Sequence, residues 1–97
     1  MEKFVYLNEL FDLYGNLLTE KQQTYFKDYY FENLSLGEIS ENYNISRNAV
    51  FNQLNQIEEK LNFYEEKLKL YSKKQEINDI IKLVNNKEVE EKLSNLL

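Results

Sequence analysis

Apolar residues recur every three or four positions along most of the chain, a spacing that predicts helices. The first segment, from Met1 to about Leu18, carries two such series and is therefore apolar on two sides. A helix of that kind lies at the centre of a fold or against a second chain, and we favour the core over a subunit interface. The two series consist of Phe4, Leu7, Phe11, Tyr14 and Leu18, and of Tyr6, Leu10, Leu13 and Leu17.

A second helix is predicted from Thr19 to about Phe31. Thr19 and Gln22 have the spacing of a capping box, in which each side chain satisfies a backbone N–H of the first turn. A dense aromatic run follows and could serve as a platform for stacked bases, but such platforms usually carry interleaved cations. Only Lys21 and Lys27 lie nearby, so we predict that most of these rings belong to the core. The run comprises Tyr25, Phe26, Tyr29, Tyr30 and Phe31.

The central stretch, residues 34–57, has the layout of a helix-turn-helix. Ser35 and Glu38 form a second capping box ahead of a short helix. Asn44 tolerates the left-handed conformation that closes a helix, and Ser46 offers the N-cap of the next one. The same pattern fits an ordinary αα-hairpin in a helical bundle. The layout therefore predicts the helix-turn-helix without deciding whether it binds DNA.

The second helix of this unit is predicted to run from Arg47 to about Tyr71, roughly 37 Å at 1.5 Å per residue. Neither Gly nor Pro interrupts it, and its apolar positions keep a heptad spacing over three repeats. This seam must pack against the final helices or against a second copy of the chain. The predicted packing or dimer seam consists of Val50, Leu54, Ile57, Leu61, Tyr64, Leu68 and Tyr71.

A polar break at residues 72–75 is predicted to separate this helix from two shorter ones. The first has an apolar stripe of Ile77, Ile80, Ile81 and Val84, and the second has Val89, Leu93 and Leu96. We therefore predict one all-helical domain over residues 1–97. It has a helix-turn-helix core with a long helix at about 1–71 and a C-terminal helical tail at about 72–97.

One face of the long helix could read a nucleic acid. Opposite the apolar stripe, the first turns present amides, and a ring and the single arginine of the chain flank them. Asn can read adenine edges, Arg can read guanine, and an aromatic ring can contact a thymine methyl. A row of amides also occurs on ordinary solvated helices. The predicted nucleic-acid-binding residues are Ser46, Arg47, Asn48, Phe51, Asn52 and Asn55.

Catalytic chemistry has little support in the composition. The chain has neither His nor Cys, which removes the commonest general base, thiol nucleophiles and zinc clusters. It also lacks a Gly-rich phosphate loop. Adjacent carboxylates such as Glu58 and Glu59 do not face one another on a helix and form no acid/base pair. We therefore expect a non-enzymatic protein with no catalytic residue, no cofactor and no metal site.

Charge and hydropathy restrict the partners. The net charge is −5, from 17 acidic and 12 basic residues, which weakens a claim of DNA binding because affinity for nucleic acids rests largely on cations. No apolar run is long enough to cross a bilayer, and the first residues lack a signal-peptide profile. We therefore expect a cytoplasmic protein without membrane insertion.

Several segments, taken in order, resemble the YlxM family of small bacterial proteins. They are Leu17–Gln22, the aromatic run Tyr25–Phe31, Ser35–Ile39, Ile45–Phe51 and the acidic segment Tyr64–Leu68. The resemblance covers roughly residues 4–68. It implies an all-α helix-turn-helix fold similar to region four of sigma factors, and a regulatory role in the signal recognition particle pathway. It implies no catalytic residue.

Three hypotheses follow for the function. The first is a regulatory or accessory protein of the signal recognition particle pathway that binds the particle's RNA or its GTPase. The second is a DNA-binding transcriptional regulator that reads its site through Arg47, Asn48, Asn52 and Asn55. The third is a structural homodimer module that uses the predicted seam and binds no nucleic acid. We expect a homodimer under the first hypothesis as well.

Overall fold

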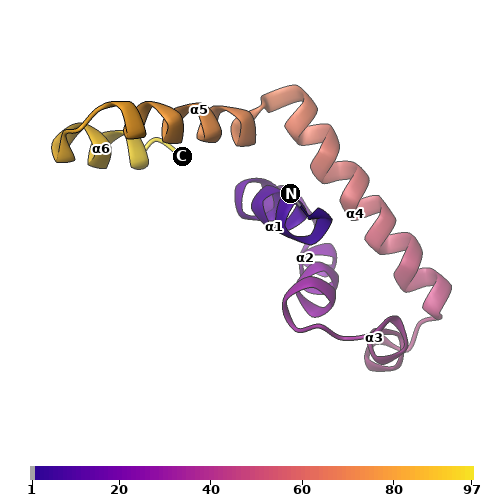
Figure 1. Cartoon of the computed structure of the whole chain (residues 1–97). Helices are drawn as coiled ribbons and strands as arrows, with labels where there is room; N and C mark the ends of the chain where they lie inside the picture. Colours follow the sequence, from indigo (N-terminus) through magenta and orange to yellow (C-terminus); the bar gives the residue numbers. More distant parts are fainter. Residues whose placement is uncertain (1) are drawn as a thin grey trace.

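The structure, a computed structural model, describes residues 2–97 and is built from helices (Figure 1). This confirms the predicted all-α helix-turn-helix fold. The elements are α1 (Lys3–Tyr14), the 3₁₀ turn η1 (Gly15–Leu17), α2 (Glu20–Phe26), the π-helical turn η2 (Lys27–Phe31), α3 (Leu36–Tyr43), α4 (Arg47–Leu68), α5 (Leu70–Leu83) and α6 (Lys87–Ser94). We call α1 to α4, with the two turns, the body, and α5 with α6 the arm.

The first helix is shorter than its apolar pattern predicts. It ends at Tyr14, because Gly15 has a low helix propensity, and a 3₁₀ turn continues the chain to Leu17. Met1 lies outside the described residues. The predicted core position is confirmed for five residues of the two series, whereas Phe4 and Leu17 are about half exposed. The five buried residues are Leu7, Leu10, Phe11, Tyr14 and Leu18.

The second helix begins with the predicted capping box. The Gln22 N–H donates to Thr19 Oγ1 at 3.1 Å, and the Thr19 N–H donates to Gln22 Oε1 at 3.2 Å. The helix continues through η2 and ends at Phe31, as predicted. Of the aromatic run, Tyr25 and Phe26 are buried in the core, and Tyr29 and Tyr30 are partly buried against it. Phe31 is 48% exposed, so the predicted core position does not hold for this ring.

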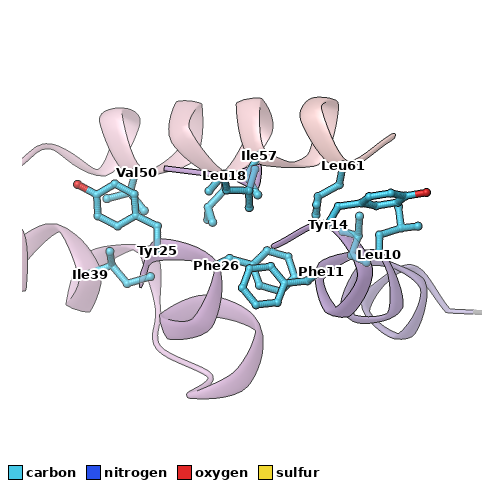
Figure 2. Packing of buried hydrophobic residues seen from close by; sticks show 12 residues of the cluster. Leu10, Phe11, Tyr14, Leu18, Tyr25, Phe26, Ile39, Val50, Ile57 and Leu61 are labelled. Atoms are coloured by element: carbon cyan, nitrogen blue, oxygen red, sulfur yellow. The ribbon is translucent and has the colours of Figure 1, made fainter. Parts of the chain in front are cut away.

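The core lies between α4 and the three helices that precede it in the chain (Figure 2). One stripe of α4 faces α1, α2 and α3, and the rings of Phe11 and Phe26 stack at 4.2 Å beneath it. Burial of this apolar surface is what holds the body together. The stripe consists of Val50, Leu54, Ile57 and Leu61, all buried.

The prediction that α4 runs to about Tyr71 was wrong, and so was the predicted break at residues 72–75. α4 ends at Leu68, Lys69 adopts the left-handed conformation with φ of 56°, and α5 begins at Leu70. The residues of the predicted break are helical and belong to α5. The chain therefore turns three residues earlier than its apolar spacing indicates.

Two side chains stabilise this turn, Glu65 from the last turns of α4 and Tyr14 from α1. The Glu65 carboxylate accepts hydrogen bonds from the backbone N–H groups of Tyr71 at 2.9 Å and Ser72 at 3.2 Å. The Tyr14 hydroxyl donates to Glu65 at 2.6 Å and accepts from the Leu70 N–H at 3.0 Å. Because the first N–H groups of a helix have no partner within it, these contacts supply the cap that the Lys69 side chain does not.

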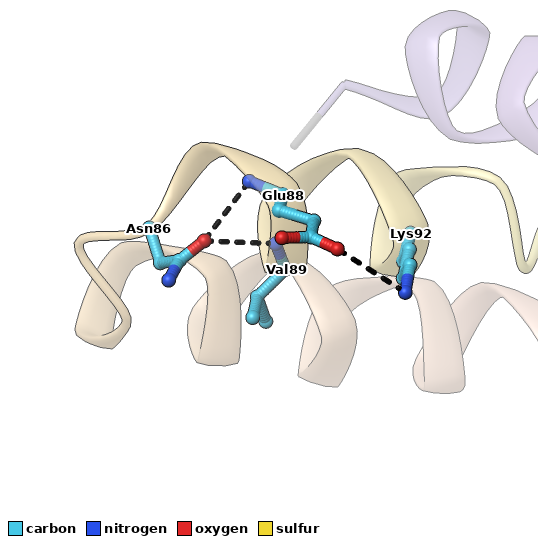
Figure 3. A network of polar contacts seen from close by, with 4 residues as sticks. All are labelled: Asn86, Glu88, Val89 and Lys92. Carbon is cyan, nitrogen blue, oxygen red and sulfur yellow. Dashed lines mark hydrogen bonds and ion pairs between the residues drawn. The ribbon is translucent and has the colours of Figure 1, made fainter.

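The arm projects from the body as a helical hairpin (Figure 1). The molecule measures 53 × 25 × 23 Å as a result. Asn86 begins α6 by accepting from the N–H groups of Glu88 and Val89, and Glu88 pairs with Lys92 at 3.5 Å (Figure 3). Among residues 2–97, no helix is both long enough and apolar enough to span a membrane.

Candidate nucleic-acid interface

The turn between α3 and α4 is closed as the sequence predicts. Asn44 is left-handed, with φ of 55°. The Ile45 N–H donates to the Ser40 carbonyl oxygen at 3.0 Å, and the Asn44 N–H donates to the Glu41 carbonyl oxygen at 3.4 Å. This pair of bonds is a Schellman motif, which satisfies the last carbonyls of α3. The angle between α3 and α4 is therefore fixed by local bonds.

Both helices of the unit begin at their predicted caps. The Glu38 N–H donates to Ser35 Oγ at 3.1 Å, and the Ser35 N–H donates to Glu38 Oε1 at 3.0 Å. The bond from this backbone N–H lowers the pKa of the Glu38 carboxyl below its ordinary value. At α4, Ser46 Oγ accepts from the Ala49 N–H at 3.0 Å. The hydrogen bond to Ser46 therefore fixes the first turn of α4, the end of the helix that would face a nucleic acid.

The structure brings the six predicted binding residues together on the outside of this end. All of them are exposed, while Val50 and Leu54 on the opposite side of α4 are buried. Within residues 2–97, the amides of Asn48, Asn52 and Asn55 make no side-chain hydrogen bond. Their donors and acceptors are therefore available to a ligand. The six residues are Ser46, Arg47, Asn48, Phe51, Asn52 and Asn55.

Arg47 rests on α3. A Cβ atom placed on Gly37 would stand 2.9 Å from Arg47 Nη2 and 3.2 Å from Cζ. The guanidinium therefore lies directly over the bare backbone of Gly37, and a larger side chain there would displace it. This contact holds the only arginine of the chain at the junction of the two helices, on the exposed side.

A second cation lies on one flank of the interface. Lys21, at the start of α2, borders a hollow of about 400 Å³ together with Ile45, Ala49 and Gln53. Lys21 is exposed and forms no ion pair in the described part of the chain. In the sequence, Lys21 lies close to the aromatic run and far from the residues of α4. Only the packing of α2 on α4 places it beside the candidate interface.

An aromatic hollow lies on the other flank, and the sequence does not reveal it. Its volume is about 180 Å³, and Phe51 of the predicted face forms part of its wall. The Phe4 ring meets the Tyr30 ring edge-on at 4.8 Å, so the wall combines residues far apart in sequence. No periodic pattern could have joined them. The lining residues are Lys3, Phe4, Tyr29, Tyr30, Leu36, Phe51, Leu54, Asn55 and Glu58.

The charge of the interface is low. From Ser35 to Ile57 the chain has one cation, Arg47, against two carboxylates, Glu38 and Glu41. Beyond Ile57, Glu58 pairs with Lys3 at 3.2 Å. Since neutralising a phosphate needs a cation, this surface can neutralise only a few phosphates. In the described part of the chain, the acidic residues form no group of three or more that could hold a metal ion.

The predicted seam divides into two parts. Val50, Leu54, Ile57 and Leu61 are covered by α1, α2 and α3 of the same chain, so this part packs within the molecule. Tyr64 and Tyr71 are partly buried, and Tyr71 belongs to α5. Leu68 is 48% exposed at the end of α4.

Comparison with known proteins agrees with this geometry. Residues 1–96 match the family described as "UPF0122: Putative helix-turn-helix protein, YlxM / p13 like". The chain is 47% identical over 58 residues to a UPF0122 protein of Shouchella clausii, which covers 60% of this chain and 53% of that protein. It is 51% identical over 59 residues to a UPF0122 protein of Desulforamulus reducens, which covers 61% and 50%. The matched region therefore spans about half the length of these relatives.

Proposed function

Because this chain belongs to the UPF0122 family of YlxM / p13-like helix-turn-helix proteins, we propose that it is a non-enzymatic regulator that binds nucleic acid through the first turns of α4. One observation carries the proposal. The helix-turn-helix is closed by its own caps, and the exposed end of α4 presents Arg47 with three unbonded amides. In helix-turn-helix proteins, this end of the second helix is the part that contacts bases.

The ligand we propose is the RNA of the signal recognition particle, the pathway that the YlxM resemblance implies. Sequence-specific RNA recognition targets unpaired bases through stacking and through hydrogen bonds to their edges. Phe51 and the aromatic hollow offer faces for stacking, and Asn52 and Asn55 offer bonds. Such recognition depends less on phosphate contacts than duplex binding does. It therefore suits a surface with few cations.

Binding of duplex DNA is the alternative that the helix-turn-helix geometry itself favours. A transcriptional regulator would place the start of α4 in the major groove and read bases through Arg47, Asn48, Asn52 and Asn55. The sigma-region-four likeness implied by the resemblance belongs to the same alternative. With Lys3 paired to Glu58, and Arg47 and Lys21 as the other cations near this end of α4, such a complex would have a shallow salt dependence and low affinity.

Fluorescence anisotropy tests the proposal. The intact protein is titrated into labelled signal recognition particle RNA and into a random DNA duplex, each at two salt concentrations. We expect RNA-selective binding that Arg47→Ala weakens by about tenfold or more, the scale of a lost base contact. Circular dichroism and melting temperature should barely change, since Arg47 is exposed.

Lys67→Ala is the matched control, because it removes a cation from the same helix about 30 Å away along its axis. Equal loss in both variants would indicate a general charge effect. Unchanged binding of Arg47→Ala would contradict the proposed site. If the unaltered protein binds neither nucleic acid, the proposal is wrong, and a pull-down with the particle's GTPase tests the remaining partner.

A further inference from the structure

The aromatic hollow beside α4 combines open rings with polar side chains. Phe4 and Phe51, which both line it, are 46% and 52% exposed, so a ligand can reach their rings. Asn55 and Glu58 of α4 line the same hollow. Pockets for drug-sized ligands measure about 300–1,000 Å³. With about 180 Å³, the aromatic hollow has room for a small flat ring system and not for a larger molecule.

The carboxylate in the hollow selects the kind of ligand. Glu58 Oε2 pairs with Lys3 at 3.2 Å, and within residues 2–97 no other side chain bonds this carboxylate. An ionised carboxylate only accepts hydrogen bonds, so a ligand that fits here must bring N–H or O–H donors. Because Lys3 offsets the charge of Glu58, a phosphate attached to the ligand is repelled less than by a bare carboxylate.

Two further polar groups of the hollow can donate. The Asn55 amide is exposed and makes no hydrogen bond in the described part of the chain. The Tyr30 hydroxyl makes none there either. Burial, with a smaller contribution from the Glu58 carboxylate, raises the pKa of Tyr30 to about 12, so this hydroxyl keeps its proton at neutral pH. The hollow therefore offers an acceptor at Glu58 and donors at Asn55 and Tyr30.

We propose that the aromatic hollow binds one unpaired guanine of the RNA strand at the start of α4, an inference that rests on the proposed function. The Watson–Crick edge of guanine presents two adjacent donors, N1–H and N2–H, which one carboxylate accepts together, and its O6 accepts from Asn55 or Tyr30. Adenine, cytosine and uracil place an acceptor beside their donor, and this acceptor would face the charge of Glu58. Phe51 and Asn55 belong to both the predicted interface and the hollow, so a strand bound at the start of α4 reaches it.

The base preference is tested with labelled single-stranded oligouridines that differ at one central position. Fluorescence anisotropy of the full chain compares guanine, inosine and adenine there. We expect the guanine strand to bind about tenfold or more tightly than the adenine strand, the scale of one bidentate base contact. Inosine lacks the N2 amino group and should lie between them.

Failure of this inference differs from failure of the proposed function. Equal affinities for the three strands, or binding of the signal recognition particle RNA without binding of any of them, would overturn the guanine site and leave the proposed function standing. Binding of neither the particle RNA nor any strand would overturn both.

Glu58→Gln separates base recognition from charge. Loss of a carboxylate near RNA weakens repulsion and raises affinity for every strand, whereas loss of a guanine contact lowers affinity for the guanine strand alone. We expect Glu58→Gln to lose the guanine preference and to bind the adenine strand at least as tightly as before. Glu59→Gln is the matched control, because it removes the same charge from an exposed neighbour outside the hollow and should keep the preference. A preference that survives Glu58→Gln, or that both variants lose alike, would overturn the inference.

Discussion

Tyr14 joins the body to the arm through a single side chain. Its ring is buried in the core, and its hydroxyl bridges Glu65 of α4 and the first N–H of α5. A buried hydroxyl that both donates and accepts is costly to remove, because its two partners lose their bonds together. Neither the apolar series that contains Tyr14 nor the acidic segment that contains Glu65 predicts this pairing.

Tyr14→Phe should therefore lower the free energy of unfolding by about 1–3 kcal/mol, with the ring packing retained. Urea denaturation followed by circular dichroism measures the change. Tyr29→Phe serves as the control, because no hydrogen bond of the Tyr29 hydroxyl occurs in the described part of the chain and its loss should cost little. Equal losses in the two variants would mean that the Tyr14 hydroxyl contributes nothing specific.

Stability should also fall in strong alkali. Burial and the bond to Glu65 raise the pKa of Tyr14 from 10.0 to about 12, burial raises that of Tyr30 to about 12, and the bond to Asp28 raises that of Tyr43 to about 12. Unfolded tyrosines lose their protons near pH 10, while these folded ones keep theirs. The contribution of these three tyrosines to the free energy of unfolding is therefore complete below pH 10 and is lost as the pH rises towards 12.

Urea midpoints measured from about pH 9 to about pH 11.5 test this dependence. The midpoint should stay level up to about pH 10 and then decline, with a shallower decline in Tyr14→Phe. A level profile over the whole range would contradict the assignment of these three hydroxyls to buried or hydrogen-bonded positions.

Among the helices, the boundary between α4 and α5 depends on one strained residue. Lys69 is left-handed, a conformation that costs a non-glycine residue roughly 1–2 kcal/mol. The bonds from Tyr14 and Glu65 hold the turn in place despite this cost. The corresponding position between α3 and α4 is occupied by Asn44, which tolerates the conformation better.

Lys69→Gly should raise the free energy of unfolding by about 0.5–1 kcal/mol, because glycine adopts positive φ without strain. Glu66→Gly, three residues earlier in the interior of α4, should lower it by about the same amount, since glycine there only adds backbone freedom. Thermal or urea denaturation compares the two variants. A loss of stability in both would mean that the turn at Lys69 is not left-handed in solution.

These two turns show which boundaries a sequence can predict. The turn at Asn44 has its signals nearby, with an αL-tolerant residue, two serine caps and a capping box within a dozen residues. All of them were predicted and are confirmed. The turn at Lys69 has no Gly, Pro or Asn. The first N–H groups of α5 are capped by Glu65, six residues before Tyr71, and by Tyr14, 56 residues away from Leu70. A local pattern cannot contain the contact with Tyr14, and the heptad spacing was extended too far.

The residues of the candidate interface could likewise be predicted only where their signals lie close together in the sequence. The six exposed residues follow from helical spacing and from the cap at Ser46, both local. Lys21 and the aromatic hollow come to the interface only through the packing of α1 and α2 on α4. The sequence therefore predicts the residues of α4 and misses the two flanks.

The molecule as a whole consists of a packed body and an extended arm. Its radius of gyration is 16.5 Å, whereas a compact domain of this length has about 12.5 Å. The core contains residues of α1, α2, α3 and α4 only. The stability of the chain therefore resides mainly in the body.

Hydrogen exchange should show this division. Amides of α6 should exchange much faster than those of α4 between Val50 and Leu61, because few apolar contacts protect them. Equal protection of arm and body would contradict the assignment of stability to the body.

Binding of RNA at the start of α4 is best tested by NMR with ¹⁵N-labelled protein and signal recognition particle RNA. We expect shifts of the Arg47 and Asn48 backbone amide signals and of the Asn52 and Asn55 side-chain amide signals. The amide signals of α5 and α6 should keep their positions. Shifts confined to the arm, or an unchanged spectrum at saturating RNA, would contradict binding at the start of α4.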